Sequence, residues 1–285
     1  MKKSFHPQWY ILILTAAAAL IGAVIRFQQL QLELLPDGSL AEGSYRHIFL
    51  IILSAVLAGG LILLILPLSD RDKWEQVFSS HPLPNALLIL SAAGLALGSV
   101  LFWLNGSQTA VPRMTQSPEL SAALIKLLPP LGILSAVCVA AFAVMCVLKK
   151  KPSPIFYMAV SVYLILRLIV HFQAWNTDPS VHDYCFKLLA SICCMLGAFQ
   201  LAGFSFGKGH RRITVFWTLC AVVFCCISLP DAYLNGTADD LLITVSVLLL
   251  MAVSGAQLLL CKEALPEEAA GKAESEPSEE KMPED

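Results

Sequence analysis

The feature that most constrains this chain is a series of long, almost uncharged apolar runs. They cover residues 9–27, 47–68, 84–104, 119–148, 155–175, 182–204, 213–229 and 239–261. Each approaches or exceeds the roughly 20 residues with which an α-helix crosses about 30 Å of hydrocarbon. Lipid offers no partner to an unpaired peptide group, so each run must close its own hydrogen bonds as a helix. The sequence therefore predicts an all-α integral membrane protein, a polytopic bundle of about eight transmembrane helices.

Composition supports this fold class and divides the chain into two parts. The chain is 57% hydrophobic and only 14% charged, which is more apolar surface than one water-soluble core could bury. We expect residues 1–261 to form a transmembrane domain whose main partner is the lipid bilayer, with no nucleic-acid partner. Residues 262–285 hold nine acidic and three basic residues and few apolar ones. They are predicted to form a disordered, acidic cytoplasmic tail.

The loops predict how the helices are threaded. If the amino terminus is cytoplasmic, ten lysines and arginines fall on the inner side: Lys2, Lys3, Arg71, Lys73, Lys149, Lys150, Lys151, Lys208, Arg211 and Arg212. Only Arg26, Arg46 and Arg113 fall on the outer side. This bias follows the positive-inside rule. We therefore expect a multi-pass protein of the cell membrane with both termini in the cytoplasm.

Two features of the runs predict local packing. Pro129 and Pro130 divide the long fourth run, which predicts a kink in the fourth helix and a spanning segment after the prolines. Gly94 and Gly98 form a G-x-x-x-G motif in the third run, which lets another helix approach closely. Packing within the chain is the favoured explanation of this motif, and dimerisation is the alternative.

The strongest functional signal is a set of ionisable residues inside the fifth and sixth runs. Arg167 and His171 are four residues apart on one predicted helix, and Asp183 and Lys187 are four residues apart on the next. Side chains at this spacing share a helical face. Because the connection between the two helices is short, the two polar faces are expected to meet in the outer half of the bilayer. A charge near mid-bilayer costs at least about 2.5 to 3.5 kcal/mol, so something must offset it.

These four residues have a functional and a structural interpretation. In the functional one, Arg167, His171, Asp183 and Lys187 form a site for an anionic or carboxylate-bearing small molecule, and Asp231 is one candidate for balancing the positive excess. In the structural one, Arg167 and Lys187 extend to the outer interface and Asp183 pairs with Lys187. The sequence leaves both open.

Cysteine and histidine usage favours packing over chemistry. The vicinal pairs Cys193-Cys194 and Cys225-Cys226, with Cys220, predict a thiol cluster between the sixth and seventh helices. Neither pair has the C-x-x-C spacing of redox and zinc motifs, so apolar packing is the favoured explanation, and soft-metal or redox chemistry is the alternative. Among the histidines, only His171 and His182 could coordinate a metal ion together. We therefore expect no metal site and no cofactor.

Catalytic motifs are missing from the sequence. It contains no G-x-x-x-x-G-K-[ST], H-E-x-x-H or G-x-S-x-G pattern, so no catalytic residue is assigned and an enzyme is not expected. The favoured function is a small-solute transporter or permease-like protein for an anion or carboxylate. The alternative is a non-transporting membrane subunit or sensor that binds a partner or an external ligand.

Overall fold

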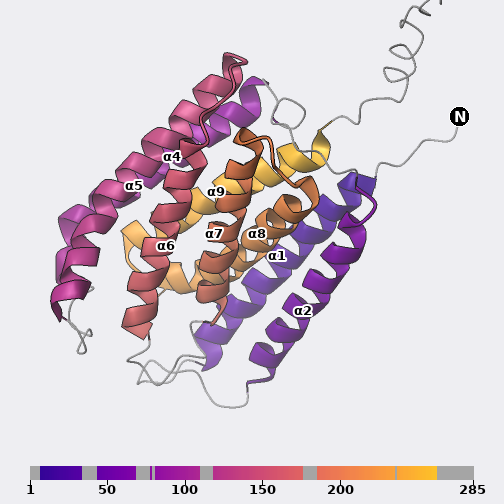
Figure 1. The fold of residues 1–285 in the computed structure, drawn as a ribbon. Coiled ribbons are helices and arrows are strands. Elements are labelled where there is room, and N and C mark those ends of the chain that lie inside the picture. The colour runs from indigo at the N-terminus through magenta and orange to yellow at the C-terminus, as the bar shows by residue number, and fades with distance from the viewer. Residues whose placement is uncertain are drawn as a thin grey trace, which may run out of the picture.

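The computed structural model describes residues 7–33, 44–68, 78, 81–109, 118–175, 185–234 and 236–261. Within these ranges the chain forms eight α-helices and no strand: α1 (Pro7–Glu33), α2 (Tyr45–Ile65), α4 (Pro82–Thr109), α5 (Pro118–Val147), α6 (Ile155–Trp175), α7 (Cys185–Ser205), α8 (Arg211–Leu234) and α9 (Ala238–Leu260) (Figure 1). All eight are long and apolar enough to cross a membrane. The prediction of an all-α, multi-pass membrane protein is confirmed. The predicted tail, residues 262–285, lies outside the described residues.

Several helices extend beyond the predicted runs. α1 continues to Glu33, past the predicted end at residue 27, α4 continues to Thr109, past residue 104, and α8 continues through Pro230 to Leu234, past residue 229. Pro129 and Pro130 lie inside α5, which extends without a break from Pro118 to Val147. A proline removes one backbone hydrogen bond, but the rest of the helix can continue beyond it when packing holds both sides. The change of helix direction at Pro129 and Pro130 stays a prediction.

Six of the helices form a closed ring. Neighbours pack in the order α4, α5, α6, α7, α8, α9, and α9 returns to pack against α4. α1 packs against α8, and α2 packs against α1, so this hairpin extends the bundle on one side (Figure 1). Successive helices alternate in direction. We call the end where α6 and α8 finish and α7 and α9 begin the Arg167 end, and the opposite end the Arg211 end.

The two halves of the ring interior have different contents. In the Arg211 half, Tyr157 of α6 reaches Ser254 of α9 with its hydroxyl at 3.2 Å and packs edge-on against Phe142 of α5. Phe78, from the connection between α2 and α4, is buried against Phe142 and Phe204. These aromatic side chains lie in the Arg211 half, where Arg211 is also buried. The ion pairs of Arg167 and Lys187 and the cavity described below lie in the Arg167 half.

Small residues allow α4 to pack closely on α9. A side chain at Gly94 would collide with the Ser246 hydroxyl, and one at Gly98 would lie 2.6 Å from Cγ1 of Ile243. Ser91, on the same face of α4, donates a 2.8 Å hydrogen bond to the Ser246 carbonyl. The G-x-x-x-G motif therefore serves packing within this chain.

The contact at Gly98 predicts opposite effects for two glycine substitutions. Gly98→Ala is expected to cost about 1–3 kcal/mol of stability, because the added methyl group would also lie 3.3 Å from backbone atoms of Asp239 and Ile243. Gly59→Ala in α2 meets nothing within 4 Å and should be neutral or gain up to about 1 kcal/mol from helix propensity. Thermal unfolding of both variants in detergent measures the difference. Equal midpoints for the two would contradict this packing.

Arginines cap two helices at the Arg211 end. Arg211, which is fully buried, donates to the carbonyl oxygens of Leu258 at 2.8 Å and Leu259 at 3.1 Å, in the last turn of α9. Arg212 donates at 2.6 Å to the carbonyl of Leu68, just after α2. The last carbonyls of a helix have no partner within it and form the negative end of its dipole, so a cation there is favourable.

Removing the Arg211 cap is expected to destabilise the bundle. Arg211→Met keeps most of the aliphatic stem but leaves two buried carbonyls without their donor, which should cost about 1.5–3 kcal/mol. Arg211→Lys should restore part of this loss because it supplies charge without the planar fork. Lys208→Met, at an exposed position nearby, is the control and should change stability by less than about 0.5 kcal/mol. Unfolding midpoints test the order of the three variants.

Candidate functional site

One carboxylate is shared by two cations from different helices at the Arg167 end. Asp240 of α9 accepts from Nη2 of Arg167 (α6) at 2.6 Å through Oδ1 and from Nζ of Lys187 (α7) at 2.6 Å through Oδ2. Arg167 also donates to Oγ1 of Thr244 at 3.4 Å. We call Arg167, Lys187 and Asp240 the Asp240 triad. It joins α6, α7 and α9, which lie on different sides of the ring.

Helix positions explain why these three groups meet. Asp240 stands in the first turn of α9, where the positive end of the helix dipole favours a carboxylate. Lys187 is in the first turn of α7, and Arg167 lies about two turns before the end of α6. Arg167 and Asp240 are each only 8% exposed. Buried charges persist when they are paired, and the triad supplies that pairing.

The structure brings together three of the four residues predicted for the site. Arg167, His171 and Lys187 line one cavity, and Asp183 lies outside the described residues. Arg167 pairs inward and is buried, so it does not extend to the surface as the structural interpretation expected. The partner that sequence reasoning missed is Asp240. Its signal was the acidic pair Asp239-Asp240 at the start of the last run, which was taken only as the boundary of a helix.

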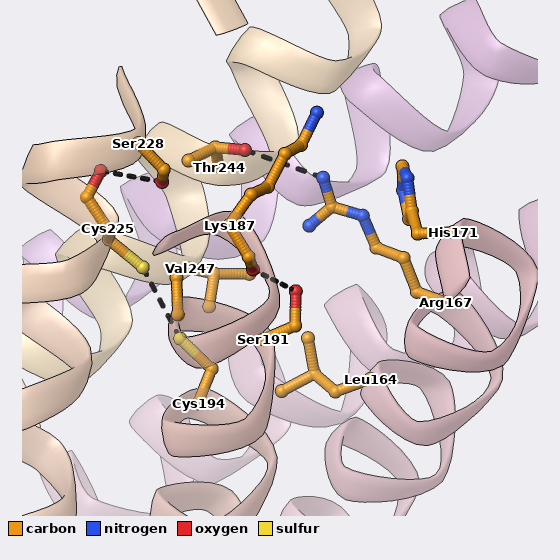
Figure 2. A pocket seen from close by; sticks show the side chains of 11 residues that line it. Leu164, Arg167, His171, Lys187, Ser191, Cys194, Cys225, Ser228, Thr244 and Val247 are labelled. Carbon is orange, nitrogen blue, oxygen red and sulfur yellow. Dashed lines mark hydrogen bonds between the residues drawn. The ribbon is translucent and has the colours of Figure 1, made fainter. Parts of the chain in front are cut away.

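The cavity is small, and Arg167, His171 and Lys187 line its charged end. Its volume is about 20 Å³, enough for about one water molecule. Four helices contribute its lining: Leu164, Arg167, His171, Lys187, Ala190, Ser191, Cys194, Cys225, Ser228, Thr244 and Val247 (Figure 2). From Lys187 to Cys194 along α7 the lining spans about 10 Å. Asp239 and Asp240 are both buried, and neither is among the residues that line this cavity.

Two thiols, one from α7 and one from α8, belong to the lining. The sulfur atoms of Cys194 (α7) and Cys225 (α8) are 3.4 Å apart, and both residues are buried (Figure 2). The predicted proximity of the cysteines of these two helices is therefore correct for this pair. In the described part of the chain, no group of three or more histidine, cysteine or acidic residues is arranged to hold a metal ion. His182, the other histidine considered as a ligand, lies outside it.

A second ionic cluster joins α1 to α8. Arg26, only 1% exposed, makes a two-pronged ion pair with Asp231, with Nε to Oδ2 at 3.0 Å and Nη2 to Oδ1 at 2.7 Å. Its Nη1 donates to Oε1 of Gln29 at 2.8 Å. The suggestion that Asp231 balances Arg167 and Lys187 was wrong, because Asp231 faces α1 and is engaged by Arg26. Arg26 was placed at the end of a run, whereas α1 continues to Glu33.

Phe186 lies between the two clusters. The guanidinium carbon of Arg26 is 5.7 Å from the centre of the Phe186 ring, and the His47 ring packs edge-on against it at 5.6 Å. Phe186 directly precedes Lys187 in the first turn of α7. The start of α7 is therefore held on one side by Arg26 and His47 and on another by Asp240.

The two cations of the Asp240 triad indicate which class of ligand its cavity could take. Arg167 and Lys187 both line the cavity, and both pair with Asp240. A small anion in the cavity would be attracted to these cations, and the planar guanidinium of Arg167 suits the two oxygens of a carboxylate. Hydroxyl groups of Ser191, Ser228 and Thr244 add hydrogen-bonding partners in the lining. Comparison with protein-family models, curated proteins and solved structures finds no match to this chain.

Proposed function

We propose that this multi-pass membrane protein transports a small monoanion, such as a short carboxylate, through a site at the Asp240 triad. The observation that carries the proposal is that Arg167 and Lys187, from two different helices, meet at Asp240 and both line one small cavity. A small anion in that cavity would be attracted to both cations.

Asp240 would compete with the ligand for Arg167 and Lys187. Its two oxygens contact Arg167 and Lys187 separately, so it can release one cation and keep the other. An incoming carboxylate would take the guanidinium of Arg167, and Asp240 would remain with Lys187. The bound anion would then lie beside a cation, which lowers the cost of holding its charge inside the membrane.

The position of the cavity supports transport over surface binding. Cys194, in its lining, lies about 14 Å along α7 from the first residue of that helix, which is close to the middle of a hydrocarbon layer about 30 Å thick. The Arg211 half of the ring is filled by Phe78, Phe142 and Tyr157. This arrangement corresponds to a closed state, and transport would require the aromatic half to open.

The Arg167 end is proposed to face outward, as the distribution of lysines and arginines predicts. A protease site or epitope inserted after Lys151, in the connection between α5 and α6 at the Arg211 end, should be inaccessible in intact cells and cleaved after permeabilisation. Cleavage in intact cells would reverse the orientation.

The test of function combines binding and uptake. Formate, acetate, chloride and nitrate at equal ionic strength are added to the purified protein, and a ligand at about 100 times its Kd should stabilise it by about 2.7 kcal/mol. The stabilising anion is then followed into proteoliposomes. Arg167→Gln should abolish both the stabilisation and the uptake. Arg46→Gln, which removes an arginine paired with Glu33 at the same end, is the matched control and should keep both.

The second candidate is a non-transporting subunit or sensor that binds an external anion. The observation in its favour is the volume of the cavity, about 20 Å³, which is smaller than a solute pathway. Anion-dependent stabilisation that needs Arg167 but occurs without uptake would support this candidate. Absence of stabilisation by every anion in the panel would overturn both.

A further inference from the structure

The Cys194–Cys225 pair has the geometry of a two-ligand metal site. The two sulfur atoms approach to 3.4 Å across the α7–α8 contact, and the residues are only 2% and 3% exposed. Both line the cavity of the Asp240 triad, so a water-sized species can reach them from that space. The other buried cysteines of these helices, Cys193 and Cys220, do not line it. This separates one pair from the general packing role of cysteine in the bundle.

We propose that Cys194 and Cys225 bind one soft monovalent metal ion, of the Cu(I) or Ag(I) type, between α7 and α8. Thiolate sulfur selects soft ions, whereas zinc usually takes four ligands. The described residues offer no third histidine, cysteine or acidic ligand in a metal-binding group here. Two sulfur ligands suit an ion that accepts two-coordinate geometry. With metal–sulfur bonds of about 2.3 Å, the two sulfur atoms would have to separate by about 1 Å to place the ion between them.

The charges around the cavity favour this complex. Binding replaces two thiol protons by one metal ion: two neutral thiols and one M⁺ give a bis-thiolate complex of charge −1 and release two protons. A bound metal ion deprotonates a coordinating thiol, so the buried thiols need not be ionised beforehand. Arg167 and Lys187 line the same cavity, and their positive charges favour an anionic complex there.

The test measures metal binding to the purified, reduced protein in detergent. Cu(I) is added as a complex with a chromophoric chelator under nitrogen. The amount of Cu(I) that the protein removes from the chelator gives the stoichiometry and the affinity of binding. The wild-type protein should bind one equivalent of Cu(I) tightly, and Cys194→Ala and Cys225→Ala should both lose this binding. The metal–thiolate absorption band in the ultraviolet should disappear in the same two variants. Cys138→Ala, which removes a buried thiol of α5, is the matched control and should keep the equivalent and the band.

Two further measurements keep the result decisive. Each variant is checked for a single, unaggregated species by size-exclusion chromatography, and Cys194→Ser and Cys225→Ser serve as alternatives if an alanine variant aggregates. Arg167→Gln should weaken metal binding, because it removes a positive charge that attracts the anionic complex. Equal uptake by wild type and the Cys225 variants, or loss of uptake in Cys138→Ala as well, would overturn the site. These readouts involve no added anion, so they fail or succeed independently of the proposed transport.

Discussion

Asp240→Asn is expected to destabilise the protein more than Arg167→Gln or Lys187→Gln. Loss of the carboxylate removes a partner from the buried Arg167 and from the half-buried Lys187 at once, whereas loss of either cation leaves Asp240 paired with the other one. Breaking a buried ion pair from one side costs about 3–5 kcal/mol, and here the cost falls on two cations at once. Thermal or chemical unfolding of the three variants, in detergent at low salt, measures the order.

The same variant also distinguishes a ligand site from a structural ion pair. Asp240→Asn removes the negative charge between Arg167 and Lys187 without changing the size of the side chain, and added formate or acetate, attracted to the two cations, should restore part of the lost stability. The wild-type protein should respond less, because Asp240 competes for the same cations. Asp239→Asn, at the adjacent buried carboxylate outside the cavity, is the control and should show no rescue. If Asp240→Asn is no less stable than Arg167→Gln, the triad does not act as described.

Arg26→Leu is expected to cost a further large amount of stability, about 3–5 kcal/mol. The substitution leaves Asp231 in α8 and Gln29 in α1 without the guanidinium that both contact. The double variant Arg26→Leu/Asp231→Leu should recover much of the loss, because a buried ion pair can be replaced by apolar groups of similar volume at little net cost. A double-mutant cycle on unfolding free energies measures the coupling between the two residues.

The Arg46–Glu33 pair provides the comparison for this cycle. It lies at the same end of the bundle, between α1 and α2, but Arg46 is more exposed, with 20% of its side chain accessible. Exposed or half-exposed pairs contribute about 0–1 kcal/mol. Coupling between Arg26 and Asp231 should therefore exceed coupling between Arg46 and Glu33 several-fold. Equal coupling energies would show that burial does not set the strength of these contacts.

Individual residues show how far sequence reasoning reached into the site. Arg167 and Lys187 were identified because a cation inside an apolar run is costly wherever the chain folds, and this cost depends only on local sequence. Asp240 is separated from Arg167 by 73 positions, and nothing local distinguishes its role from that of Asp239. Similarly, Asp231 follows the predicted seventh run, and its suggested role as a counter-charge to Arg167 and Lys187 is wrong because it pairs with Arg26. Arg26 is 205 positions away from it, and no pattern links the two.

The sequence alone determined that this protein is a helical membrane bundle, which helices it contains and that polar groups gather in α6 and α7. These conclusions depend on runs long enough to span the hydrocarbon layer and on the absence of any other partner there for peptide groups. Only the tertiary structure decided that α9 closes the ring on α4 and carries Asp240 to face Arg167 and Lys187. Helix order in a bundle follows from side-chain packing between distant segments, and apolar runs of similar length do not specify their neighbours.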